Sequence, residues 1–158
     1  MIQGIDPFGV IAYQAYGKDR NQYEHGIYTG IYGQCIEYVR RWLIHMYGLT
    51  FESIPEAIHL LDVPYVYNIN TFRMVSFPTI LNGSGPLPRI GSILVFKKNQ
   101  ENPHGHVAVV IGIQPNRIYL SEQNYSTEKW EQNYSRTIPM QYSYVMDPDC
   151  IGWKTVLL

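Results

Sequence analysis

The sequence of 158 residues lacks a long hydrophobic run, lacks an excess of charge of either sign and contains only two cysteines. Its longest apolar stretch, residues 107–113, is too short to cross a bilayer. Twelve basic and thirteen acidic residues give a formal net charge of -1, so we expect neither nucleic acid nor a membrane as a partner. Two cysteines are too few for a disulfide framework.

The N-terminus lacks the basic start of a Sec signal peptide, and Asp6 and Pro7 interrupt any apolar segment there. We therefore expect a cytoplasmic protein with reduced cysteines, while secretion by a route other than Sec stays open. The sequence contains no P-loop and no dinucleotide fingerprint, and no cofactor is expected. The length fits a single domain over residues 1–158, and the oligomeric state stays unknown.

The strongest periodic pattern runs from Gln34 to about Gly48. Apolar residues recur there at spacings of three and four, which is typical of one face of an amphipathic helix. Glu37 and Arg41 lie four apart on the opposite face, where they would pair. Gly48 is a suitable C-terminal stop, so the pattern predicts a helix.

The rest of the chain reads as shorter elements. Residues 1–33 are expected to be irregular, residues 54–62 indicate a short helix with Pro55 in its first turn, and residues 64–90 are rich in turns. Strands are predicted at residues 92–97, 107–113, 117–122, 135–146 and 150–157. One early helix followed by an antiparallel meander indicates an α+β fold.

Cys35 stands just inside the start of the predicted helix. The positive end of the helix dipole and the unpaired backbone N–H groups there favour a thiolate, which predicts a lowered pKa and a nucleophile. Gly30 and Gly33 precede it and leave room for a substrate. The alternative is that Cys35 is a small buried residue beginning the apolar face.

A thiolate nucleophile needs a general base, and histidine is the usual choice. Of the five histidines, His45 and His59 lie on predicted helices, and His25 and His104 lie in loops without an anchor. His106 opens the buried strand over residues 107–113, so it would be held at the rim of the sheet. This position favours His106 as the base.

The predicted hairpin places a carboxylate beside His106. If residues 114–116 form the turn, Ile113 faces Arg117, His106 faces Asn124, and Glu122 is the diagonal neighbour on the same face. Glu122 would then orient the imidazole. A slip of one residue would move Glu122 to the other face, and a solvated charge at a strand end is the alternative.

A metal site is the rival interpretation of the two histidines in His104-Gly105-His106. A single residue between them is a weak ligand spacing, and the two cysteines are isolated rather than paired as C-x-x-C. We therefore expect no metal.

Several segments together resemble the CHAP amidases, a family with a papain-like fold of the NlpC/P60 type. Residues 33–43 (GQCIEYVRRWL) resemble the family's nucleophile helix, and residues 105–110 (GHVAVV) resemble its histidine strand. Residues 121–124 (SEQN) resemble its acidic segment, and residues 88–96 (PRIGSILVF) its preceding strand, with Ser92 where an Asp is common. The variety most similar is found in glutathionylspermidine amidase and in the amidase half of trypanothione synthetase.

The resemblance implies a nucleophile helix packed on an antiparallel sheet and assigns roles to individual residues. Cys35 would be the nucleophile, His106 the general base and acid, and Glu122 the orienting group. Gln34 would help to form the oxyanion hole. Arg40 matches an arginine near the substrate or else is an exposed partner of Glu37, and Asn124 is either a second support or a plain strand-end residue.

The sequence leaves three hypotheses for the function of the chain. The first is a cysteine amidase that cleaves a glutathione–polyamine conjugate such as glutathionylspermidine, without the ligase activity of bifunctional relatives. The second keeps the chemistry but cuts peptidoglycan, as a lysin or effector; no wall-binding repeat supports it. The third is a catalytically silent binding module. In the first two, the partner is a small-molecule or peptide amide substrate.

Overall fold

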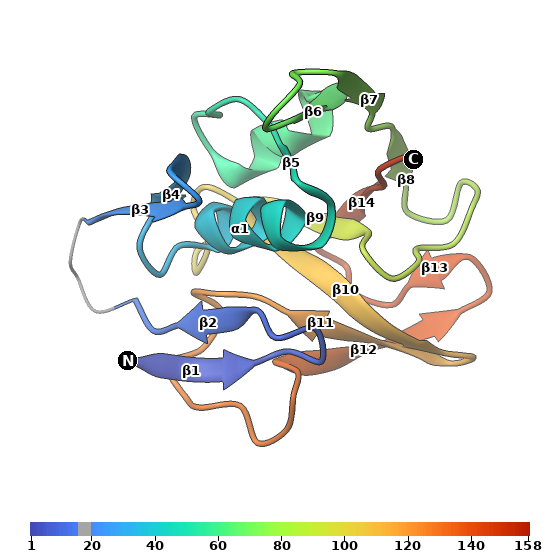
Figure 1. Cartoon of the computed structure of the whole chain (residues 1–158). Coiled ribbons are helices and arrows are strands. Elements are labelled where there is room, and N and C mark those ends of the chain that lie inside the picture. Colours follow the sequence, from blue (N-terminus) through green and yellow to red (C-terminus); the bar gives the residue numbers. More distant parts are fainter. Residues whose placement is uncertain (16–19) are drawn as a thin grey trace.

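The structure is a computed structural model that describes residues 1–15 and 20–158, and it places one helix against a curled antiparallel sheet (Figure 1). The sheet has seven strands in the order β13-β12-β11-β10-β9-β14-β8, and all neighbours are antiparallel. This confirms the α+β prediction. The strands are β8 (Thr79–Leu81), β9 (Ile93–Phe96), β10 (His106–Gln114), β11 (Arg117–Ser121), β12 (Arg136–Gln141), β13 (Tyr144–Val145) and β14 (Cys150–Lys154).

Helix α1 (Cys35–Tyr47) is the predicted helix. It begins after Gln34 and ends at Gly48, whose φ of 65° is the left-handed conformation that glycine adopts at helix ends. Its apolar side chains pack on the sheet, with Tyr38 and Trp42 fully buried. These contacts form one layer of the core, and a second apolar cluster lies on the other face of the sheet around Leu94, Ala108, Leu120 and Trp153.

Glu37 and Arg41 form the predicted pair, on a face of α1 that is buried. Both side chains are buried, with Nε of Arg41 3.0 Å from Oε2 of Glu37. The N-terminal strands cover this face of α1, since Thr29 donates a hydrogen bond to Glu37 and Arg41 donates one to the backbone of Ile11. The helix is therefore buried on two sides.

The prediction that residues 1–33 are irregular is wrong for residues 1–15 and 20–33, and residues 16–19 lie outside the described part of the chain. The described residues of this segment contain two hairpins, β1 (Ile2–Ile5) with β2 (Ile11–Tyr13), and β3 (Asn21–Glu24) with β4 (Ile27–Ile31). His25 and Gly26 both have positive φ, as a tight two-residue hairpin turn requires. The strands have three to five residues, which is too few for a visible alternation pattern.

The segment after α1 carries more strand than its turn-rich sequence suggests. A small sheet is formed by β5 (Leu49–Thr50), β6 (Tyr65–Asn68) and β7 (Met74–Ser76). The helix predicted over 54–62 is a 3₁₀ helix over Ala57–Asp62, so Pro55 lies before it rather than in its first turn. None of the helices in the described ranges is long and apolar enough to span a bilayer.

The hairpin of β10 and β11 differs from its predicted register and then returns to it. Gln114 pairs with Arg117, so the turn is one residue shorter than predicted. The register shifts between Val110 and Gly112, where Ile111 is the extra residue of a bulge. Beyond the bulge, Val110 pairs with Leu120, as the prediction requires, and this register continues toward His106.

Candidate active site

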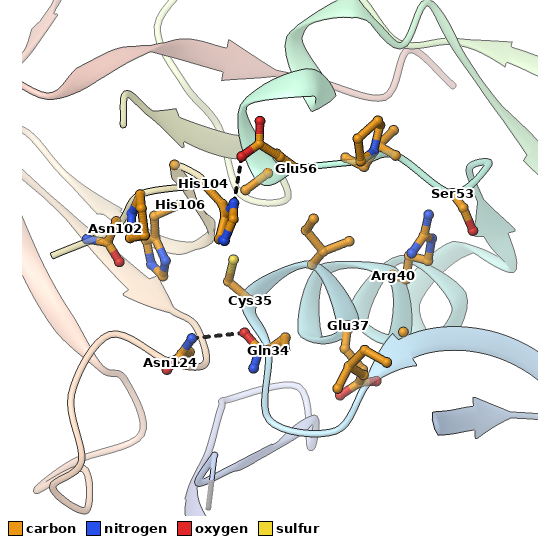
Figure 2. Close-up of a pocket in the computed structure, with 18 of the residues that line it drawn as sticks. Gln34, Cys35, Glu37, Arg40, Ser53, Glu56, Asn102, His104, His106 and Asn124 are labelled. Atoms are coloured by element: carbon orange, nitrogen blue, oxygen red, sulfur yellow. Dashed lines mark hydrogen bonds and ion pairs between the residues drawn. The ribbon is translucent and has the colours of Figure 1, made fainter. Parts of the chain in front are cut away.

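Cys35 is the first residue of α1, and its side chain points into the cleft (Figure 2). Two residues before Cys35, the backbone at Gly33 packs closely against Ala15. A Cβ on Gly33 would lie 2.7 Å from the Cα of Ala15. With a φ of 80°, Gly33 also adopts a conformation that other residues rarely take. The glycine before the helix therefore serves the packing that positions the thiol.

His106 is the first residue of β10 and is 3% exposed. Its Nε2 lies 2.7 Å from Oε1 of Glu122, which is 1% exposed, so the two groups form the contact that the hairpin geometry predicts. The same imidazole and the Cys35 thiol both line the cleft, and each shifts the pKa of the other toward its charged form. Because Nε2 contacts Glu122, Nδ1 is the nitrogen left for the sulfur.

The contacts among these three groups shift their pKa values toward the charged forms. Burial raises the pKa of the Cys35 thiol, but the hydrogen bond and charge of His106, with two backbone N–H groups, bring it below its ordinary value. Burial lowers the pKa of His106, whereas Cys35 and Glu122 raise it to about 9. Burial raises the pKa of Glu122, whereas His106 and Arg136 lower it to about 2. The arrangement favours a thiolate–imidazolium pair.

Arg136, on β12, is a site residue that the sequence analysis missed. Its Nε lies 3.0 Å from Oε2 of Glu122, and its Nη2 lies 3.1 Å from Oε1. The guanidinium also lies 3.7 Å from the centre of the Tyr125 ring. Arg136 reaches Glu122 because β12 pairs with β11, where Leu120 lies opposite Arg136. No local sequence motif marks that pairing.

The cleft beside Cys35 has a volume of about 340 Å³. Arg40 lines it and is 4% exposed, so the alternative of an exposed partner for Glu37 is wrong. The Arg40 guanidinium donates to the backbone carbonyls of Phe51, Thr29 and Glu52, with Nε 3.2 Å from the oxygen of Phe51. A cation fixed in this way contributes a positive wall to the cleft.

Gln34 and Asn124 meet at the rim of the same cleft. Nδ2 of Asn124 donates to Oε1 of Gln34 at 2.9 Å, and both residues are exposed and line the cleft (Figure 2). Asn124 has a φ of 61°, a conformation that asparagine adopts more readily than most residues. The structure thus brings all six predicted site residues to one place, and their roles stay predictions.

His104 is better anchored than its loop position suggests. Its Nδ1 lies 2.6 Å from Oε2 of Glu56, and Nζ of Lys98 lies 2.7 Å from the other oxygen of that carboxylate. His104 and Glu56 line the cleft above Cys35 (Figure 2). In residues 1–15 and 20–158, no group of three His, Cys, Asp or Glu side chains is placed to hold a metal ion.

Comparison with known proteins gives several related enzymes, including the following three. The chain is 25% identical over 145 residues to trypanothione synthetase of Crithidia fasciculata, covering 89% of this chain and 22% of that protein. It is 31% identical to glutathionylspermidine synthase of the same organism, covering 80% and 19%. It is 31% identical over 119 residues to the bifunctional glutathionylspermidine synthetase/amidase of Escherichia coli K12, covering 72% and 19%. The chain spans about a fifth of the length of these relatives.

Among solved structures, the crystal structure of Ly7917 is similar, with 19% identity, a TM-score of 0.47 and coverage of 78% of this chain and 53% of that one. The CHAP domain matches residues 22–124, which include Cys35, His106 and Glu122. This match covers well over half of the described chain, and relatives at 31% identity agree with it. The chain belongs to the CHAP domain family.

Proposed function

We propose that this chain is a cysteine-dependent amide hydrolase that cleaves a glutathione–polyamine conjugate such as glutathionylspermidine. The observation that carries the proposal is that Cys35 and His106 line one cleft, with Glu122 hydrogen-bonded to His106 behind it. A nucleophile, a base and an orienting carboxylate in this order are the parts that acyl transfer needs. Membership of the CHAP family and relatedness to a synthetase/amidase support amide hydrolysis.

The proposed reaction has two halves. The Cys35 thiolate attacks the amide carbonyl, and the oxyanion is stabilised by the backbone N–H of Cys35 and the side chain of Gln34. His106, protonated on Nδ1, gives its proton to the departing amine as the C–N bond breaks, which leaves a thioester. His106 then takes a proton from water, which attacks the thioester; the C–S bond breaks, the acid leaves, and the thiolate–imidazolium pair is restored.

The charges in the cleft suit a conjugate that carries both carboxylate and ammonium groups. Arg40 provides a fixed positive charge in the wall, and Glu101 provides a negative charge, whereas the Glu56 carboxylate is already paired with Lys98 and His104. A glutathionyl group has carboxylates for Arg40, and a polyamine has ammonium groups for Glu101. The names of the relatives place the same conjugate among their substrates or products, which supports this choice.

The test is release of spermidine from glutathionylspermidine by the purified chain and by a Cys35→Ala variant. The wild type is expected to release spermidine and glutathione in equal amounts, and the variant to lose at least about a thousandfold in rate. Cys150→Ala, which removes the other cysteine on β14, is the matched control and should keep full activity. No release by the wild type would refute this substrate.

Peptidoglycan is the competing substrate for the same chemistry. A turbidity assay on purified cell walls, run with the same variants, separates the two substrates. Clearing of walls by the wild type but not by Cys35→Ala, without spermidine release, would assign the chain to cell-wall cleavage. An iodoacetamide titration in which Cys35 reacts as an ordinary thiol, together with inactivity on both substrates, would favour a silent binding module.

A further inference from the structure

A buried amide outside the cleft joins the two halves of the candidate active site. Gln123 follows Glu122 directly, is 0% exposed and does not line the cleft. Its Nε2 donates to the backbone carbonyl of Gln34 at 2.8 Å and to Oε1 of Glu37 at 3.2 Å. Gln34 is the residue before Cys35, so the hydrogen bond fixes the point from which the nucleophile helix begins.

The oxygen of the same amide accepts two hydrogen bonds. Oε1 of Gln123 accepts from the backbone N–H of Tyr13 at 2.8 Å and from Nη2 of Arg41 at 2.9 Å. An amide has two donor hydrogens and two acceptor lone pairs, so the capacity of Gln123 is fully used. Through Tyr13 and Arg41 the amide is tied both to β2 and to the middle of α1.

The buried ion pair of Glu37 and Arg41 gives this connection its rigidity. The Glu37 carboxylate also accepts from Oγ1 of Thr29 on β4 at 2.7 Å. Gly30 permits this close packing, since a Cβ there would lie 3.0 Å from the Cβ of Glu37. Hydrogen bonds to charged groups in a buried network are costly to break, so Gln123 is held in one place.

Two consecutive residues, Glu122 and Gln123, therefore contact the imidazole and the start of the nucleophile helix. Glu122 hydrogen-bonds the imidazole of His106, and Gln123 hydrogen-bonds the residue that precedes Cys35. Movement of this dipeptide relative to α1 would change the separation of the thiol and the imidazole.

We propose that Gln123 is a positioning residue that sets the geometry of the Cys35–His106 pair. The expected effect on kcat rests on the proposed function, whereas the expected effect on Cys35 alkylation does not. Gln123 acts through the start of α1 and contacts no substrate, so its loss should lower kcat and leave KM nearly unchanged.

The test is the pH dependence of iodoacetamide alkylation of Cys35 in Gln123→Met, which keeps similar volume but removes all four hydrogen bonds. The midpoint should move to higher pH, and the rate at pH 7 should fall about tenfold or more, because a displaced imidazole stabilises the thiolate less. Lys154→Met is the matched control, because it also removes buried hydrogen bonds, to Leu61, Val63 and Thr79, outside the cleft. It should lower the melting temperature without moving the alkylation midpoint.

A folded Gln123→Met variant with wild-type alkylation and wild-type kcat would overturn the proposal. If that variant does not fold, Gln123→Asn decides, because its shorter side chain withdraws the amide from Gln34 without adding a charge beside Glu37. A wild-type midpoint in that variant would likewise overturn the proposal. Alkylation needs no substrate, so a shifted midpoint in a chain that releases no spermidine would support Gln123 while refuting the substrate.

Discussion

Arg136 donates two hydrogen bonds to the carboxylate of Glu122, and the same carboxylate contacts Nε2 of His106. Glu122 is thus held by a cation while it orients the imidazole. Hydrogen bonds to charged groups are stronger than neutral ones, so the arginine fixes both the position and the charge of Glu122. The candidate site accordingly extends one strand further than its three central residues, to β12.

Replacing Arg136 with Met should raise the pKa of Glu122 and loosen its contact with His106. We expect kcat/KM for amide cleavage to fall about tenfold, part of the roughly hundredfold or larger contribution of a positioned acid–base group. The acid limb of the pH–rate profile should move to higher pH. Arg117→Met, which removes an exposed arginine from the neighbouring strand, is the control. Equal activity of the two variants would show that Arg136 does not support Glu122.

The thiolate–imidazolium pair predicts a bell-shaped pH dependence. The thiolate forms as pH rises through the lowered pKa of Cys35, and His106 loses its proton above about 9. Amide cleavage should therefore rise, reach a plateau and fall again near pH 9, whereas alkylation should rise without the later fall. A cleavage profile that still increases above pH 10 would contradict the protonated state of His106.

His106→Gln isolates the effect of the histidine on the thiol. Without His106, burial is the largest remaining influence on the Cys35 pKa and raises it. We expect alkylation at pH 7 to fall about tenfold or more, since only the thiolate reacts. His59→Gln, outside the cleft, serves as the control. Unchanged alkylation in His106→Gln would mean that the helix start alone activates Cys35.

The stability of the fold should depend on the charge of Glu122. Its pKa is about 2 in the folded chain against an ordinary 4.5, so its stabilising contribution is present above pH 4.5 and is lost as pH falls toward 2. Urea unfolding of wild type and Glu122→Gln should show a difference that changes by about 2 to 3 kcal/mol over this range. A difference independent of pH would refute the lowered pKa.

Trp42 anchors α1 to the N-terminal hairpin. Its Nε1 donates to Oδ2 of the buried Asp6 at 2.7 Å, and the ring is 0% exposed. Trp42→Phe should lower the free energy of unfolding by about 2 to 3 kcal/mol, because it removes core volume and the shorter of the two hydrogen bonds to Oδ2 of Asp6, the other coming from Tyr38. Trp130→Phe, at a half-buried position, should cost clearly less in the same urea titration.

Long periodic segments could be predicted from the sequence, and short or covered ones could not. The apolar spacing over α1 and the apolar run of β10 are strong signals because each persists over many residues. The strands in residues 1–31 are too short to show a pattern, so the burial of Glu37 and Arg41 beneath them could not be predicted. Burial of a charged side chain depends on what covers it, which local sequence does not reveal.

Within the site, the position of Glu122 could be predicted only because two errors cancelled. The turn after β10 is one residue shorter than expected, and the bulge at Ile111 restores the pairing near His106. Gln123 and Arg136 belong to no local pattern, and their importance comes from tertiary contacts with α1 and with Glu122. Such supporting residues need coordinates to be found.

Strand β14 lies in the interior of the sheet, between β9 and β8. Every side chain assigned to the candidate chemistry precedes it along the chain, and so leaves the ribosome earlier. During synthesis the sulfur, imidazole and carboxylate would all be present while one edge of β9 still lacked its partner. We therefore expect a newly made chain to acquire reactivity only after residues 150–154 have emerged and completed the sheet.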